Sequence, residues 1–175
     1  MMRRRGFLAT GAGALLSACG FQPVYMPTAS GKAGVAQREL AAIHVNLMSD
    51  RPGQEMRQAL QDRLEMGNDG VAKRYDLTVA YGVGGEGIAV LPNTDATRIR
   101  FTGSATWTLT AQDPGRTKLS SGYAKTVDAL NIFDGQYFAS DLETEAVEKR
   151  MAEALADQIT IQLAAYFRKR AASGG

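Results

Sequence analysis

Hydrophobic residues alternate with polar ones in four stretches of the chain, and this two-residue period is typical of β-strands with one buried face. The stretches lie at residues 43–47, 75–83, 98–110 and 118–127. The third is the clearest, because its odd-numbered residues from Ile99 to Leu109 are apolar or small and its even-numbered residues are polar. One apolar and one polar face predict a sheet that is covered on a single side.

Two other segments repeat their apolar residues at three- and four-residue steps, which predicts helices. The first lies between Pro52 and Gly67, and the second begins at Ser140, where Ser140 and Glu143 predict a capping box, and runs for about thirty residues. The element order β-α-β-β-β-α therefore predicts an α+β fold. We expect a two-layer sandwich, with two helices packed on one face of a roughly four-stranded mixed sheet.

The first eighteen residues have the features of an export signal. Arginines at positions 3–5 precede an apolar run from Phe7 to Leu16, which is too short for a membrane-spanning helix of ~20 residues. The next residues, Leu16-Ser17-Ala18-Cys19, match the bacterial lipobox. We therefore predict a signal peptide at 1–18 and lipidation of Cys19. The arginine pair also resembles a twin-arginine motif, so the Sec and twin-arginine export routes both stay open.

The predicted domain organisation follows from these segments. Residues 19–38, rich in Pro, Gly, Ala and Ser, are expected to form a flexible tether behind the lipidated cysteine. A single α+β domain is expected at 39–171, followed by a disordered tail at 172–175. A lipid-anchored location on the periplasmic side of the outer membrane is favoured by Gly20, which stands where an Asp would favour another destination.

Charge and composition argue against several classes of protein. Removal of the signal lowers Lys and Arg from 20 to 17 against 18 Asp and Glu, so no net positive charge favours nucleic-acid binding. One Cys and one His exclude an intramolecular disulfide and a zinc site built from Cys and His. His44 is expected to be a half-exposed strand residue.

No catalytic motif stands out, and we predict neither an enzyme nor a cofactor or metal site. Gly82 to Gly87 fit the pattern G-x-G-x-x-G, but the following residues predict a strand where dinucleotide binding requires a helix. A glycine-rich bend or bulge between strands explains the pattern better. The carboxylates of the last helix alternate with basic residues, which is typical of a solvated helix face.

Four basic residues on the predicted strands are candidate ligand contacts. Arg98 and Arg100 share the polar face of their strand, and Lys118 and Lys125 lie on the strand that follows. Such a cluster would bind phosphate groups or an acidic glycolipid. Scattered solubilising charges on an exposed face are the alternative.

The segment Cys19-Gly20-Phe21-Gln22-Pro23-Val24-Tyr25 resembles the start of the lipopolysaccharide-assembly lipoprotein family LptE, in its alphaproteobacterial form. The apolar pattern of 155–167 is similar to that family's last helix, and the predicted element order is also the family's. The resemblance covers essentially the whole chain. Its motifs concern structure and lipid attachment, and the middle of the chain departs most.

The resemblance implies a role and partners. LptE proteins plug the outer-membrane β-barrel LptD, help it assemble, and assist delivery of lipopolysaccharide (LPS) to the outer leaflet. On this interpretation Arg98 and Arg100 are expected to meet the phosphates of lipid A, with Lys118 and Lys125 as further candidates. Two other functions stay open: an auxiliary lipoprotein of another lipid-transport system of the ABC type, and a lipid-anchored periplasmic hydrolase.

Overall fold

The computed structural model describes residues 34–65, 70–90, 96–132 and 137–174. The predicted signal peptide, Cys19 and most of the expected tether lie outside the described residues. The described part has the element order α2-β1-α3-β2-β3-β4-α4.

One four-stranded sheet runs through the described part in the order β1-β2-β3-β4. The short strand β1 (Ile43–Val45) pairs in parallel with β2 (Tyr75–Val90). The long strands β2, β3 (Ala96–Ala111) and β4 (Lys118–Asn131) pair antiparallel. The predicted four-stranded mixed sheet is confirmed, and the predicted element order β-α-β-β-β-α matches apart from the additional helix α2.

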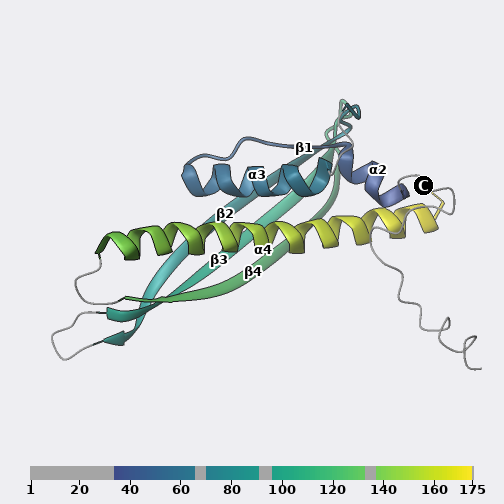
Figure 1. Cartoon of the computed structure of the whole chain (residues 1–175). Helices are drawn as coiled ribbons and strands as arrows, with labels where there is room; N and C mark the ends of the chain where they lie inside the picture. The colour runs from purple at the N-terminus through teal and green to yellow at the C-terminus, as the bar shows by residue number, and fades with distance from the viewer. Residues whose placement is uncertain (1–33, 66–69, 91–95, 133–136, 175) are drawn as a thin grey trace, which may run out of the picture.

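Three helices lie against one face of this sheet (Figure 1). They are α2 (Val35–Ala41), α3 (Arg51–Glu65) and α4 (Tyr137–Ala172). At 1.5 Å per residue the 36 residues of α4 extend about 54 Å. The helix runs along the sheet beside α3, in the same layer. The opposite face of the sheet has no helix on it among the described residues, so the predicted two-layer α+β sandwich with one covered face is confirmed.

The main hydrophobic core lies between the helices and one half of the sheet. The strands contribute the residues that the alternation predicted, such as Leu77, Trp107 and Leu109, each at most 2% exposed. The predicted apolar stripe of α3 is also confirmed, because Met56, Leu60 and Leu64 are at most 1% exposed. Burial of large side chains on both layers is the dominant favourable contribution to this packing.

A second, smaller cluster lies under the other half of the sheet. It consists of Phe101, Leu130, Val147 and Met151, with partly buried neighbours packed against it. Its helical residues come from α4 alone. The sheet therefore has a proximal half (75–79, 105–111 and 118–124), covered by α2, α3 and α4, and a distal half (83–90, 96–103 and 126–131), covered by the first part of α4.

Helix α2 was not predicted from the sequence, and the start of α4 differs from the predicted one. Helix α2 begins at Val35, inside the segment expected to be tether, and its seven residues are too few for a clear helical period. Helix α4 begins at Tyr137, so Ser140 lies inside it and the predicted capping box is wrong. The helix ends at Ala172, and the Ser173 backbone N–H still donates to the carbonyl of Lys169.

The glycine-rich segment, expected to be a bend or bulge between two strands, is part of a single strand and has a register shift at its end. Gly82 to Gly87 lie within β2, which continues to Val90 and pairs with β3. The irregularity follows the glycines, because the register shifts between Gly87 and Ala89. A strand with few side chains on its open face still forms its backbone ladder, since β3 supplies the hydrogen-bonding partner.

Candidate functional site

The uncovered side of the sheet, called here the open face, is a surface that the described helices leave free. On β3 it consists of the even-numbered residues from Arg98 to Thr110, as the alternation predicted. Small residues of β2 lie beside them, with Ala80 opposite Thr106 and Gly82 opposite Ser104. The edge strand β4 adds larger side chains, of which Tyr123 and Val127 are each 55% exposed. The open face is thus smooth and polar over β2 and β3, with apolar side chains standing along β4.

The structure places Arg98 and Arg100 together on the open face, at its distal end. Arg100 does not stand alone: its guanidinium lies 3.3 Å from a carboxylate oxygen of Glu86 on the neighbouring strand. The two side chains are 47% and 68% exposed, so water screens the pair and its energetic contribution is small. Arg98 is exposed and has no ion pair among the described residues.

The hairpin register separates the other two predicted cations from this pair. Lys125 lies opposite Ser104, four residues along β3 from Arg100, which corresponds to about 13 Å. Lys118 lies opposite Thr110, so about 40 Å of strand separates it from Arg98. The four residues share one face, but the sheet does not bring them into one cluster.

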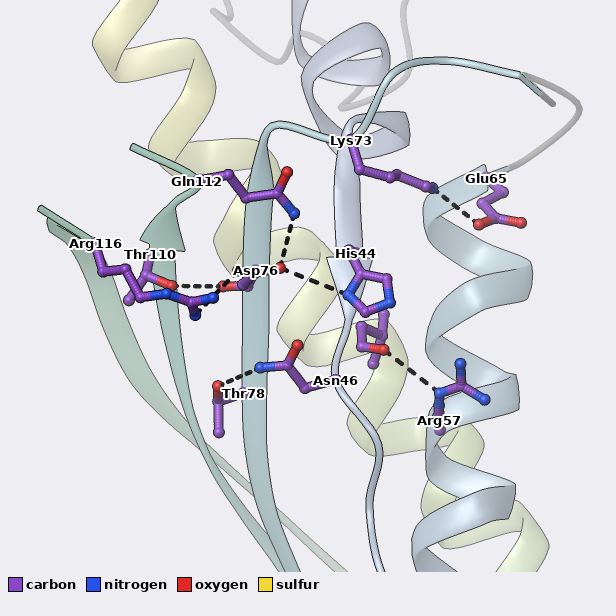
Figure 2. Close-up of polar contacts among 11 residues, drawn as sticks. His44, Asn46, Arg57, Glu65, Lys73, Asp76, Thr78, Thr110, Gln112 and Arg116 are labelled. Carbon is purple, nitrogen blue, oxygen red and sulfur yellow. Dashed lines mark hydrogen bonds and ion pairs between the residues drawn. The ribbon is translucent and has the colours of Figure 1, made fainter. Parts of the chain in front are cut away.

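A polar network at the proximal end of the open face was not predicted (Figure 2). Its centre is Asp76 on β2, which is only 6% exposed. Gln112 donates to one carboxylate oxygen at 2.8 Å, and Arg116 donates to the other at 3.3 Å. The Nδ1 of His44 lies 3.5 Å from the same carboxylate. His44 is half-exposed, as predicted, but its partner comes from another strand.

This network joins three parts of the chain. His44 belongs to β1, Asp76 to β2, and Gln112 and Arg116 to the turn between β3 and β4. A buried carboxylate is costly unless hydrogen bonds and positive charge compensate for its lost hydration, and both are present here. The network therefore holds the β3–β4 turn against the edge of the sheet. Its members are up to 72 positions apart, so no local sequence pattern signals it.

Two glutamines of α4 bind the backbone of the edge strand. The side-chain amide of Gln162 donates to the carbonyl of Tyr123 at 3.1 Å, and that of Gln158 donates to the carbonyl of Lys125 at 3.3 Å. The indole N–H of Trp107 donates to the side-chain oxygen of Gln162 at 3.0 Å. Exposed strand edges can pair with strands of other chains. Because the carbonyls of Tyr123 and Lys125 already accept hydrogen bonds from the glutamines, such pairing is less favourable along this part of β4.

The contact between α3 and α4 contains an unusual buried hydroxyl. Arg63 of α3 pairs with Asp157 of α4, and Arg51 pairs with Glu145 at 2.9 Å. Below these pairs the hydroxyl of Tyr81 is buried and has no hydrogen-bond partner among the described residues. Burial, with smaller contributions from the Glu148 and Glu55 carboxylates, raises the pKa of Tyr81 to about 12. The tyrosine is therefore neutral at physiological pH.

Two absences hold for the described part of the chain. Within the described ranges, His, Cys, Asp and Glu nowhere gather in threes in a way that suits a metal ion. Among the described helices, none is both long enough and apolar enough to cross a membrane.

The fold is that of solved bacterial lipoproteins. A candidate lipoprotein from Caulobacter crescentus CB15 aligns with a TM-score of 0.62 and 19% identity, covering 76% of this chain and 96% of that one. The rare lipoprotein B from Shewanella oneidensis aligns with a TM-score of 0.55 and 14% identity, covering 70% and 92%. At these identities the likeness concerns the fold alone. A sequence comparison with curated proteins finds no match.

The sequence itself defines the family. Residues 40–163 match the LptE family, which is described as lipopolysaccharide-assembly. The chain belongs to this family, and the match includes every strand of the sheet, α3 and most of α4. The resemblance found in the sequence is confirmed. Membership gives the protein a role in lipopolysaccharide assembly.

Proposed function

We propose that the protein is an outer-membrane lipoprotein, anchored by lipid on Cys19, that occupies the LptD β-barrel and helps it assemble. The open face supports this proposal best, because strands of 16, 16 and 14 residues present a polar surface with no described helix on it. A strand of 16 residues extends about 50 Å, and the apolar band of a membrane β-barrel is ~25 Å tall. Such a face is long enough to contact a polar lumen over its full height.

We also propose that the protein assists lipopolysaccharide transport through cations on this face. Arg98 and Arg100 carry the proposed contact, and Lys125 extends it toward the middle of the sheet. Charge-assisted hydrogen bonds from guanidinium groups suit the phosphates of a glycolipid. In the absence of ligand the Glu86 carboxylate competes for Arg100, so phosphate binding would require Arg100 to exchange one anionic partner for another.

Affinity purification from gently solubilised outer membranes tests the barrel contact. We expect a stoichiometric barrel of LptD size to co-elute with the tagged protein. Thr106→Asp, on the open face, should reduce its recovery severalfold, because a carboxylate against the lumen lacks a partner. Ala165→Asp, on an exposed position of α4, is the matched control and should leave recovery unchanged. Recovery of inner-membrane ABC components instead would favour the auxiliary-lipoprotein function.

A second pair of variants tests the lipopolysaccharide contact. Replacement of Arg98 and Arg100 by Ala should weaken lipopolysaccharide binding at low salt by about tenfold, whereas Glu86→Gln should strengthen it by freeing Arg100. Lys149→Ala, which removes an exposed charge from α4, is the control for net charge. If Lys149→Ala weakens binding as much per charge removed as the replacement of Arg98 and Arg100 does, affinity follows net charge alone and the proposed contact is wrong.

A further inference from the structure

Charge is distributed unevenly along α4. Its first twelve residues include Asp141, Glu143, Glu145 and Glu148, and its last five residues include Arg168, Lys169 and Arg170. The two ends are about 54 Å apart. The longest element of the protein is therefore acidic at its start and basic at its end, which gives the domain a permanent charge asymmetry.

Helix α2 lies beside the C-terminal part of α4 (Figure 1). Val35 of α2 and Arg170 of α4 line one small hollow together with Arg74. Val35 is 45% exposed although it is apolar, and Arg38 is exposed one turn further along α2. We call the surface formed by Val35, Arg38, Lys169 and Arg170 the basic end.

The cations of this surface differ from several arginines elsewhere in the fold. Those arginines lie against carboxylates, as in the pairs Arg51–Glu145, Arg63–Asp157 and Arg150–Asp128. Within the part of the chain that the structure describes, Arg38, Lys169 and Arg170 have no carboxylate within 4.0 Å. The one acidic side chain in the hollow, Glu39, already accepts from Arg74 and from the Tyr75 hydroxyl. The positive charge of the basic end is therefore uncompensated.

The predicted lipid anchor lies close to this surface along the chain. The described part begins at Gly34, directly before the basic end, and Cys19 precedes Gly34 by fifteen positions. A fully extended segment of that length reaches at most about 50 Å. A lipid anchor at Cys19 would thus hold the basic end within about 50 Å of the bilayer, whereas the acidic start of α4 lies about 54 Å farther along the helix.

We propose that the basic end rests on anionic phospholipid headgroups of the leaflet that holds the anchor. Cations near an anionic leaflet are attracted by its surface potential, and the exposed Val35 side chain can enter the interface between them. Helix α4 then points away from the bilayer surface, and its acidic start and the distal half of the sheet lie farthest from the headgroups. This proposal rests on lipidation of Cys19, which is part of the proposed function.

The test uses the lipidated mature protein in vesicles. Because lipidation consumes the Cys19 thiol, one introduced cysteine can be labelled selectively. Val35→Cys carries a fluorophore at the basic end, and Leu142→Cys, 69% exposed in the native protein, carries it at the acidic end as the matched control. Quenching by headgroup-labelled lipid is compared in phosphatidylcholine vesicles with and without phosphatidylglycerol.

We expect phosphatidylglycerol to raise quenching at position 35 about threefold and to leave position 142 unchanged. Salt at 1 M should remove the increase, because it shortens the Debye length to about 3 Å. Lys169→Glu combined with Arg170→Glu should also remove it, whereas Lys149→Glu, which changes a lysine of the acidic half, should not. Equal quenching at both positions, or no dependence on lipid charge, would overturn the proposal.

Two controls distinguish membrane contact from a loss of helix stability and from glycolipid binding. The same cations also suit the negative end of the α4 dipole, so the thermal unfolding of each variant is compared with that of the native protein. Loss of quenching in a double variant that retains native unfolding supports membrane contact. If quenching at position 35 rises with vesicles that contain lipopolysaccharide and does not rise with vesicles that contain phosphatidylglycerol, the proposal is overturned in favour of a glycolipid site. Recovery of the barrel by the double variant tests the proposed function separately, because both substitutions lie off the open face.

Discussion

The proximal and distal halves of the sheet have similar backbones but different cover. In the proximal half, Leu77, Trp107 and Leu109 belong to a core that residues of α2, α3 and α4 share, and they are at most 2% exposed. In the distal half, Phe101 and Leu130 are 8% and 6% exposed and pack against α4 alone. The same three strands therefore pass from a large core into a small one.

The glycines differ in the same way. Gly122, in the proximal half, lies so close to the Trp107 ring that an added Cβ would meet it at 2.6 Å. Gly103, on the same covered side of the sheet in the distal half, would bring a Cβ to 2.8 Å from the end of the flexible Met151 side chain. The ring belongs to the large core and the flexible chain end to the small one, so we expect the proximal half to be the more stable. Surfaces that must adapt to a partner are often drawn from the less stable parts of a protein.

The largest expected effect concerns the two cores. Leu155→Ala removes a fully buried side chain of α4 from the main core and should lower the free energy of unfolding by about 3 kcal/mol. Phe101→Ala should cost about half as much, because the small cluster can collapse toward solvent. Urea unfolding measures both changes in free energy. Hydrogen exchange should show that Phe101→Ala accelerates the exchange of the backbone amides of 83–90 more than that of the amides of 75–79. Equal global costs would contradict the division into two halves.

A smaller effect is expected from the glycines. Gly122→Ala should cost about 2 kcal/mol, because the new methyl group must displace the Trp107 ring and the Gln162 side chain that binds it. Gly103→Ala, also on the covered side, should cost only about 1 kcal/mol, because the flexible end of the Met151 side chain can move away from the new methyl group. The melting temperatures of the two variants are compared, and similar losses would show that the distal half is packed as rigidly as the proximal half.

The smallest effect concerns Tyr81, which lies between the two halves on β2. Its pKa is raised to about 12 by burial, so the unfolded chain, with an ordinary tyrosine pKa near 10, ionises first as pH rises. Stability contributed by the neutral phenol is complete below pH of about 10 and is lost as the pH rises toward about 12.

Tyr81→Phe should remove this part of the alkaline loss. At pH 7 it should be neutral or slightly stabilising, because the hydroxyl has no partner to lose among the described residues. Unfolding curves at pH 7 and pH 11 provide the measurement. Tyr123→Phe, on the exposed part of β4, is the control. An unchanged pH dependence in the Tyr81 variant would show that the hydroxyl is solvated.

Much of the fold followed from the sequence because its signals are local. The alternation in 98–110 predicted both the strand β3 and the side on which the helices pack, and the stripe of Met56, Leu60 and Leu64 predicted the buried face of α3. Errors occurred where local preference was weak or was overridden by neighbours. Helix α2 is too short for its period to be visible, and Gly82 to Gly87 form strand because β3 pairs with them.

The candidate site was less accessible to sequence reasoning. Alternation placed Arg98, Arg100, Lys118 and Lys125 on strands and on one face, but pairing register decides how far apart they lie. Register depends on the position of the β3–β4 turn and on the bulge near Thr110, and these distribute the four cations over the length of the sheet. The Glu86 partner of Arg100 is likewise a consequence of pairing.

The sequence by itself determined the alternating strands, the amphipathic helix α3 and membership of the LptE family, and it predicts the lipobox. Each of these depends on patterns of residues along the chain. Only the tertiary structure decided the Asp76 network, the buried Tyr81 hydroxyl and the meeting of α2 with the last turn of α4. These features join residues from distant parts of the chain, and their energies depend on burial and distance. Packing alone brings such residues together, so the uncompensated charge of the basic end is visible only in the folded protein.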